Sequence, residues 1–386
     1  MGQLIDQSQI ESQKLGLKTT YNKDNLWQDR LSLTAGLDVL QDDTEQRLIR
    51  YNRSWTPKMS YQNLAPFAQA RLSLTERLSL NAGVRYEYGK LSVDDYYTLA
   101  GYTRANSFGA RRYTPTFVQG GEVSFDKALP SAGLTFDLTP KLQAFASYSQ
   151  GLGMPDVGGA LRAITALNQS VENIELSPIV TDNMEAGLRF SGEKLTADLS
   201  VYQSKSDLGS TLEYVPAVQG YRAVRSETDI KGGEVSLGYR PNKSHHFTAS
   251  FAHTQGKYDA NNNGVMVDMP ARNISPNKLS LGYTHTLANQ GSMSLTATHL
   301  FDRKYPDIAA GVQSKFDGYT LVDFGYRQPV SHRFGKGVIG FGVNNLLNTD
   351  YQNFISQTVL VDDRSDTTRY SSGRGRNYNL SYTFEF

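Results

Sequence analysis

Apolar and polar side chains alternate along many short segments of this chain. The clearest segment is 376–386, in which every second position is apolar: Tyr378, Leu380, Tyr382, Phe384 and Phe386. The positions between them are polar: Asn377, Asn379, Ser381, Thr383 and Glu385. Because neighbouring side chains of a strand point to opposite faces, this segment predicts a strand with one apolar face and one polar face.

The same pattern predicts about 15 strands in the whole chain. They are expected near 12–21, 28–41, 61–74, 78–91, 122–137, 142–151, 180–190, 195–206, 221–240, 247–257, 277–287, 292–301, 318–329, 338–347 and 376–386. Residues 1–11 are predicted to be a non-strand segment before the first strand. Each predicted strand is long enough to cross a bilayer at a tilt.

The connections between these strands alternate between short turns and long polar loops. Turns are predicted at 22–25, 75–77, 139–141, 191–194 and 241–243. Loops are predicted at roughly 42–60, 92–121, 152–178, 207–220, 258–275, 302–317 and 348–375. A soluble sandwich or propeller does not predict this asymmetry, whereas an outer-membrane barrel does. The predicted fold class is therefore all-β, a transmembrane antiparallel β-barrel.

The composition narrows the class further. No run of about 18 apolar residues occurs, which counts against a transmembrane helix. Cysteine is absent, which excludes disulfides and thiol chemistry. A net charge of +1 argues against a nucleic-acid binder, which would carry a basic stripe. The 23 Tyr and 17 Phe residues suit the aromatic belts of a membrane protein.

The number of predicted strands raises a question of closure. The first and the last strand run in the same direction, but antiparallel neighbours around a closed ring require an even number. An unpaired strand edge in hydrocarbon is costly, because no water satisfies its N–H and C=O groups. We therefore expect further strands before residue 12. Residues 1–7 lack the pattern of a signal peptide, so we also expect either a removed leader or a longer parent protein.

Several segments match a known family in the right order. They are Tyr148-Ser149-Gln150-Gly151, Glu185-Ala186-Gly187-Leu188-Arg189-Phe190, Val343-Asn344-Asn345-Leu346-Leu347-Asn348-Thr349-Asp350-Tyr351 and Gly373-Arg374-Gly375-Arg376. Together with the Phe-terminated last strand, they resemble TonB-dependent outer-membrane receptors over nearly the whole chain. Within that family the chain is most similar to ferric siderophore receptors of the aerobactin-receptor type.

The resemblance implies a domain and a function. Residues 1–386 would be the C-terminal part of a barrel of about 22 strands, without the plug domain that fills such barrels. The implied ligand is a ferric siderophore of the hydroxamate or citrate type, with no cofactor. The implied partners are an inner-membrane TonB complex, in the full-length parent, and outer-membrane lipid and lipopolysaccharide, but no nucleic acid. The implied location is the bacterial outer membrane, and no enzymatic activity is expected.

Two predicted loops carry the candidate ligand contacts. Arg and Tyr occur together there, and such side chains offer charge-assisted hydrogen bonds and rigid rings to a compact anionic chelate. The first loop contributes Arg50, Arg53 and Trp55, and the second contributes Tyr96, Tyr97, Tyr102, Arg104, Arg111, Arg112 and Tyr113. The alternative role for these side chains is to form ordinary polar loops that bind lipopolysaccharide phosphates.

Other sites and functions are less well supported. Asp259, Asn261, Asn263 and Gly264 imitate the start of a calcium loop, but the twelfth position is Pro270 rather than Glu. We therefore expect an Asn-rich loop there, and no metal site or catalytic residue elsewhere. Charged residues are predicted on the polar faces of strands, facing water or a plug: Arg85, Glu87, Glu185, Arg189, Asp198, Glu234 and Arg240. The alternative functions are a passive outer-membrane pore, an adhesin-like barrel, a barrel hydrolase and a truncated receptor that does not transport.

Overall fold

The computed structural model describes residues 7–50, 52–98, 103–104, 111–112, 117–162, 164, 169–173, 176–215, 220–271, 273–307, 312–333, 335–358 and 372–385. Most of these residues lie in strands. They form two compact units, the first comprising Met1–Leu134, Ser147–Asp182 and Ser206–Arg225, and the second comprising Thr135–Ala146, Asn183–Lys205 and Ser226–Phe386. Each unit is described by itself.

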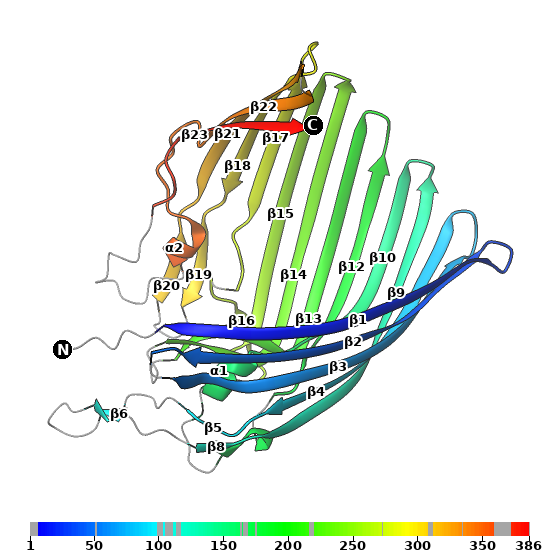
Figure 1. The fold of residues 1–386 in the computed structure, drawn as a ribbon. Helices are drawn as coiled ribbons and strands as arrows, with labels where there is room; N and C mark the ends of the chain where they lie inside the picture. Colours follow the sequence, from blue (N-terminus) through cyan, green and yellow to red (C-terminus); the bar gives the residue numbers. More distant parts are fainter. Residues whose placement is uncertain are drawn as a thin grey trace. The chain divides into compact units, whose positions relative to one another are not determined.

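The first unit is built on long consecutive hairpins. Its strands β1 (Ser8–Leu26), β2 (Leu31–Leu48), β3 (Arg53–Ser73) and β4 (Leu78–Val93) pair antiparallel in chain order (Figure 1). Five further strands have one end in each unit: β9 (Gly121–Thr139), β10 (Leu142–Gly153), β12 (Ile179–Ser191), β13 (Leu195–Val215) and β14 (Gly220–Asn242).

The second unit continues with the same kind of pairing. Its strands are β15 (His245–Asp259), β17 (Lys278–Thr286), β18 (Ser292–Leu300), β21 (Tyr319–His332), β22 (Gly335–Asn344) and β23 (Asn377–Glu385). Each of these strands pairs antiparallel with the next one named, and β14 pairs with β15. The short strand β16 (Met266–Asp268) adds to the other end of β15.

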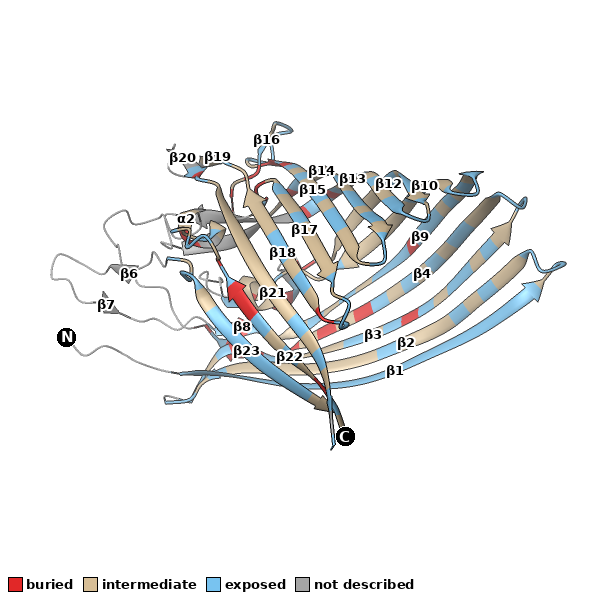
Figure 2. Ribbon diagram, turned by 90° about the horizontal axis from the view of Figure 1, so that it is seen from above, coloured by how far each residue is buried: buried red, intermediate tan, exposed pale blue. Residues whose placement is uncertain are grey.

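The prediction of strands is confirmed. Among the described residues the main sheet has 16 strands, and without the short β16 the remaining 15 follow one another in chain order from β1 to β23. They coincide with the 15 predicted segments. The two strands that end this order, β1 and β23, are exposed along most of their length (Figure 2).

Some boundaries were wrong. Strand β1 begins at Ser8, so the non-strand segment predicted for 1–11 is too long. The turn predicted at 22–25 lies instead at 27–30, because a register shift between Lys23 and Leu26 lets the strand continue. The loops predicted at 42–60 and 207–220 are largely strand. Residues 42–47 are polar at every position. Both faces of the strand are therefore polar here, and an alternation of apolar and polar side chains could not reveal it.

Side-chain oxygens close several of the short turns. The Thr75 hydroxyl accepts hydrogen bonds from the N–H groups of Arg77 and Leu78, at 3.1 and 3.0 Å. The Thr139 hydroxyl does the same in the next turn, and the Asn242 carboxamide accepts two N–H groups in a third. Thr and Asn in these positions mimic backbone turns, and they specify where a strand reverses.

The strands share one large-scale feature, an apolar face and a polar face. In the second unit, Leu281 pairs across with Ala249 and Ala297, whereas its neighbour Ser280 pairs with Ser250 and Thr298. Many apolar side chains on these strands remain exposed, including Leu199, Leu237 and Leu281. The apolar face of the described strands is therefore not buried against a second layer of the protein, and it is stable only in contact with an apolar environment.

Buried apolar residues gather in the connections between the long strands. One cluster in the first unit contains Leu91, Val93, Tyr96, Val118, Leu161, Val171 and Leu176. The second unit has one cluster around Tyr258, Met269 and Ile274 and another around Ala271, Tyr305 and Phe316. The helices are short, α1 (Val157–Arg162) and α2 (Phe354–Thr358), and no helix of the described residues can span a membrane.

Candidate functional site

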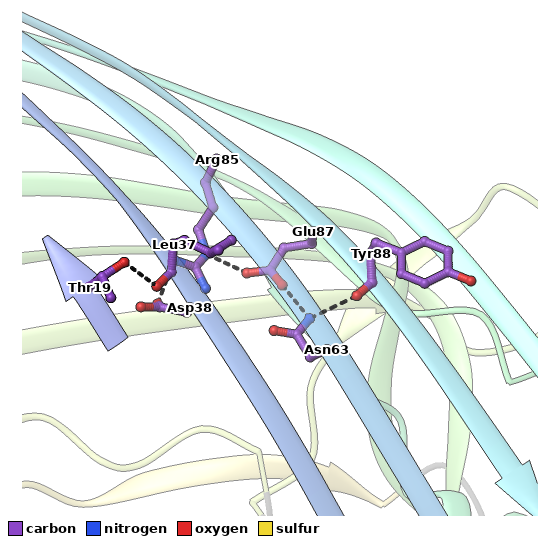
Figure 3. Close-up of polar contacts among 7 residues, drawn as sticks. All are labelled: Thr19, Leu37, Asp38, Asn63, Arg85, Glu87 and Tyr88. Atoms are coloured by element: carbon purple, nitrogen blue, oxygen red, sulfur yellow. Dashed lines mark hydrogen bonds and ion pairs between the residues drawn. The ribbon is translucent and has the colours of Figure 1, made fainter. Parts of the chain in front are cut away.

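The polar face of β2–β4 carries a network of charged and amide side chains. The Arg85 guanidinium lies 2.8 Å from the Asp38 carboxylate and also forms an ion pair with Glu87 on the same strand. The Asn63 amide of β3 donates to Glu87 at 2.6 Å, so three strands contribute to one cluster (Figure 3). These side chains are partly exposed to water, so each pair contributes at most about 1 kcal/mol.

The network confirms where sequence alternation placed these charges. Residues 85 and 87 share one face of β4, while Val84, Tyr86 and Tyr88 of the other face are exposed apolar or aromatic side chains. In the second unit Arg189 and Asp198, both predicted on polar faces, form an ion pair at 2.8 Å. The polar face is therefore a hydrated, charged wall rather than a buried interior.

The loops of the first unit fold into a compact body that we call the loop core. Its members come from two loops that are far apart in sequence, and they pack against Leu91 and Val93 at the end of β4. Its elements are β5 (Tyr96–Tyr97), β8 (Phe117–Gln119), β11 (Gln169–Ser170), the 3-10 turn η1 (Val171–Asn173) and helix α1. Strand β8 pairs with both β5 and β11, so the two loops share one small sheet.

Specific hydrogen bonds fix the loop core. The Tyr96 hydroxyl donates to the Leu161 carbonyl at 2.9 Å, and Arg162 of α1 donates to Thr56 of β3 at 2.6 Å. Asp95 accepts the Gly120 N–H at 2.6 Å, which joins the start and the end of the loop 92–121. These bonds reduce the freedom of long loops, so the surface that the loops display is preorganised.

The loop core presents two aromatic rings to solvent. Within β5, Tyr96 is buried and Tyr97 is 62% exposed; within β8, Val118 is buried and Phe117 is 42% exposed. The register pairs Tyr96 with Val118 and Tyr97 with Phe117, so the two exposed rings lie together with centroids 5.3 Å apart. Alternation in these two short strands anchors one pair of side chains and displays the other.

The structure places the predicted contact residues of this loop differently. Tyr96, predicted to contact a ligand, has its ring in the loop core and its hydroxyl bonded within it. Tyr97, also predicted as a contact, is exposed on the surface of the loop core. Phe117 of the same predicted loop was not among the predicted contacts, and its ring lies beside that of Tyr97.

The remaining predicted contact residues are placed as follows. Arg50 lies in the short turn between β2 and β3, and Arg53 and Trp55 lie on β3 itself, all three exposed. The strands β6 (Thr103–Arg104) and β7 (Arg111–Arg112) pair Arg104 with Arg111, which places three arginines in one hairpin. Tyr102 and Tyr113 lie outside the described residues.

In the Asn-rich loop after β15, the Asp259 carboxylate accepts hydrogen bonds from backbone N–H groups of the same loop. The Asp259 oxygens accept N–H groups of Asn261, Asn263 and Gly264, at 3.3, 3.1 and 2.6 Å. These bonds hold the turn of the expected Asn-rich loop. Within the described ranges, no three His, Asp or Glu side chains are grouped as metal ligands.

Burial in the loop core raises the pKa of Tyr96 to about 12. An unfolded tyrosine has a pKa of about 10. The folded pKa is raised, so this residue's contribution to loop stability is constant below pH ~10 and decreases as the pH rises from ~10 to ~12. We expect the tyrosinate difference spectrum between the wild type and Tyr96→Phe to show a midpoint near pH 12.

A control variant for this titration is Phe117→Leu, which leaves the number of tyrosines unchanged. Its difference spectrum should show no such transition. A wild-type minus Tyr96→Phe spectrum that is complete by pH ~10 would contradict the buried position of Tyr96.

The class that this fold defines is that of transmembrane β-barrel proteins. Their long amphipathic strands are joined alternately by short turns and by longer loops. The chain belongs to the family described as TonB dependent receptor-like, beta-barrel, which matches residues 3–346.

Known relatives agree with this family. The chain is 26% identical over 413 residues to a ferric aerobactin receptor of Klebsiella pneumoniae, covering 98% of this chain and 54% of the relative. It is 26% identical over 351 residues to a rhizobactin receptor of Rhizobium meliloti (strain 1021), covering 86% of this chain and 44% of the relative. The chain thus spans about half the length of the curated relatives it matches.

Solved structures show the same fold. The copper transporter OprC matches with a TM-score of 0.74 at 18% identity, covering 98% of this chain and 57% of that one. The ferric citrate transporter FecA matches with a TM-score of 0.66 at 15% identity, covering 97% and 55%. These two neighbours have different named substrates, so the fold alone does not specify the substrate.

Proposed function

We propose that this chain forms the wall and the recognition loops of an outer-membrane receptor for a ferric siderophore of the hydroxamate or citrate type. The observation that carries the proposal is the loop core, which displays Tyr97 and Phe117 as a rigid aromatic pair. Rigid rings on a preorganised loop give contact area at a low entropy cost. The relatives at 26% identity are named as ferric aerobactin and rhizobactin receptors, which supports this ligand class.

The arginines of the loops supply the complementary charge in this proposal. Arg50, Arg53, Arg104, Arg111 and Arg112 would make charge-assisted hydrogen bonds to the carboxylates or hydroxamates of the chelate. Trp55 would add ring surface, as would Tyr102 and Tyr113. The chemistry is binding and passage of a chelated ion, without bond making or breaking, so we propose a receptor rather than an enzyme.

The apolar faces of the strands would contact lipid in the bacterial outer membrane, and the polar faces would contact water. This chain matches only about half of each curated relative. We propose coupling to an inner-membrane TonB complex only for a full-length protein that also contains the counterpart of the unmatched half. A passive pore is the second candidate, because a hydrated charged face suits diffusion equally well. A steady conductance of the refolded protein in a planar bilayer would favour the pore.

We expect Tyr97→Ala combined with Phe117→Ala to weaken binding of ferric aerobactin at least about tenfold. Each ring that is removed should contribute about 1 kcal/mol or more to the free energy of binding. Binding would be measured by fluorescence quenching or retained iron on the folded protein in detergent. The control is Tyr21→Ala, which removes an equally exposed ring from β1, 66% exposed against 62% for Tyr97. Equal affinities of the double variant and the wild type would contradict the proposed site.

A further inference from the structure

Two histidines face each other across strands β15 and β17 of the second unit. His245 of β15 lies directly opposite His285 of β17 in the antiparallel register. Their rings are stacked, with centroids 4.7 Å apart and an angle of 26° between the ring planes. Two imidazole nitrogens that bind one metal ion, each about 2.0–2.1 Å from it, lie at most about 4 Å apart. The two rings are therefore close enough to share one bound ion.

A methionine on a third strand extends this pair of histidines. His285 also lies directly opposite Met293 of β18, whose side chain is 40% exposed. Residues that lie opposite each other on antiparallel strands project to the same face, with Cβ atoms about 4.5–5.5 Å apart. The thioether side chain of methionine is flexible, so its sulfur can turn toward an ion held by the neighbouring imidazoles. We call His245, His285 and Met293 the His-His-Met row.

A tyrosine fixes the ring of His245. The Nδ1 atom of His245 lies 2.8 Å from the Tyr283 hydroxyl oxygen. In the tautomer in which Nδ1–H donates to this oxygen, Nε2 carries the lone pair that can bind an ion. Histidines that bind metals almost always hold their second ring nitrogen in such a hydrogen bond, which sets the tautomer and the ring orientation.

The second histidine has a nitrogen without a partner. The Nδ1 atom of His285 is shielded from solvent and has no hydrogen-bond partner among the described residues. Buried polar atoms of native proteins are nearly always paired, so this nitrogen calls for a partner. An aromatic rim at a membrane interface needs only rings, which Phe247 and Tyr283 already supply with centroids 4.8 Å apart. The two imidazoles add metal-binding nitrogens that such a rim does not require.

The chemistry of the row favours monovalent copper. No third His, Asp or Glu joins the two histidines in the part of the chain that the structure describes, so the Met293 thioether is the third ligand. Imidazole suits zinc and copper alike, but a thioether is a soft ligand that selects monovalent copper. All three ligands are neutral, and the next row on the same face consists of Phe247, Tyr283 and Leu295. Surroundings of low polarity favour the ion of lower charge.

We propose that the His-His-Met row binds a single monovalent copper ion through His245 Nε2, an imidazole nitrogen of His285 and the Met293 sulfur. Tyr283 is a positioning residue, because it acts through His245. The row lies beside the short turns that join β14 to β15 and β17 to β18. In the proposed function these turns face the periplasm, which would supply the ion. Sequence alone predicts no metal site, because the three residues come from three strands and meet only through the register.

The test measures the copper affinity of the untagged full chain, folded in detergent. Monovalent copper, kept reduced by ascorbate, would be titrated in competition with a coloured chelator. We expect His245→Ala and His285→Ala each to weaken binding at least about 30-fold, and Tyr283→Phe to weaken it about tenfold. Met293→Leu should weaken copper binding about tenfold and leave zinc binding unchanged, because the thioether discriminates between the two metals.

The matched control is His246→Ala. His246 is the adjacent histidine of β15 and lies opposite Thr284, on the other face of the sheet. This variant should bind copper as the wild type does, and all variants should keep the folded, heat-modifiable electrophoretic mobility.

X-ray absorption spectroscopy of the copper-loaded wild type should show nitrogen neighbours and one sulfur neighbour, and Met293→Leu should lack the sulfur. Equal copper affinity of the wild type and His285→Ala overturns the site, as does a wild-type spectrum without sulfur. No siderophore enters these measurements, so failure of the copper site is distinguishable from failure of the proposed function.

Discussion

Replacement of Leu161 by Asp is expected to reduce ferric-siderophore binding by more than about 100-fold while the long strands stay folded. Leu161 is fully buried in the loop core, and its carbonyl accepts the Tyr96 hydroxyl. Burying an unpaired carboxylate there costs several kcal/mol, and the loops can avoid that cost only by opening. Opening separates β5 from β8, which removes the paired display of Tyr97 and Phe117.

Ferric-aerobactin binding and limited proteolysis would be measured on the same preparation. The variant should be cleaved within 92–121 or 152–178 and should keep its heat-modifiable mobility. Leu347→Asp is the control, because Leu347 is 62% exposed and lies outside the loop core. Wild-type affinity in Leu161→Asp would show that the loop core does not organise the binding surface.

The second prediction concerns the two faces of the sheet. Leu281→Arg is expected to destabilise the protein in lipid vesicles by about 2–4 kcal/mol, since it places a charge on the face proposed to contact lipid. Ser280→Arg, one residue earlier, should be tolerated. Ser280 lines a cavity together with Asp198, Glu234 and Lys278, where an added guanidinium would find two carboxylates beside the one lysine.

Urea unfolding of the two variants, refolded into the same vesicles, would measure the difference directly. The two positions are adjacent on β17, so the two variants carry the same new side chain, in the same strand and at nearly the same depth in the membrane. Equal loss of stability in both variants would contradict the difference between the two faces, and greater loss in Ser280→Arg would reverse their roles.

Much of the fold could be predicted because strand alternation is a local signal. A residue's neighbours at two-residue spacing reveal its face, and Thr75, Thr139 and Asn242 mark reversals through their own side-chain hydrogen bonds. The same signal failed where both faces are polar. Strand β2 continues to Leu48 because Lys14 and Ser12 of β1 bind Asp42 across the pair, and such cross-strand partners cannot be identified from one segment alone.

The candidate site was only half predictable. Two adjacent tyrosines of the same loop have opposite roles, Tyr96 in the loop core and Tyr97 on its surface. Their sequence context cannot distinguish them, because the core that buries Tyr96 is supplied by Leu161 and Val171 from another loop. The display of Phe117 could not be predicted for the same reason, since it depends on pairing between β5 and β8.

The sequence by itself therefore determined the number and order of the long strands, the identity of their apolar and polar faces and the family. Only the tertiary structure decided which loop residues are anchors and which are displayed, and how far the polar strand ends extend. The physical reason is that alternation and turn chemistry act between residues close in sequence, whereas burial of a loop side chain depends on partners that arrive from distant segments.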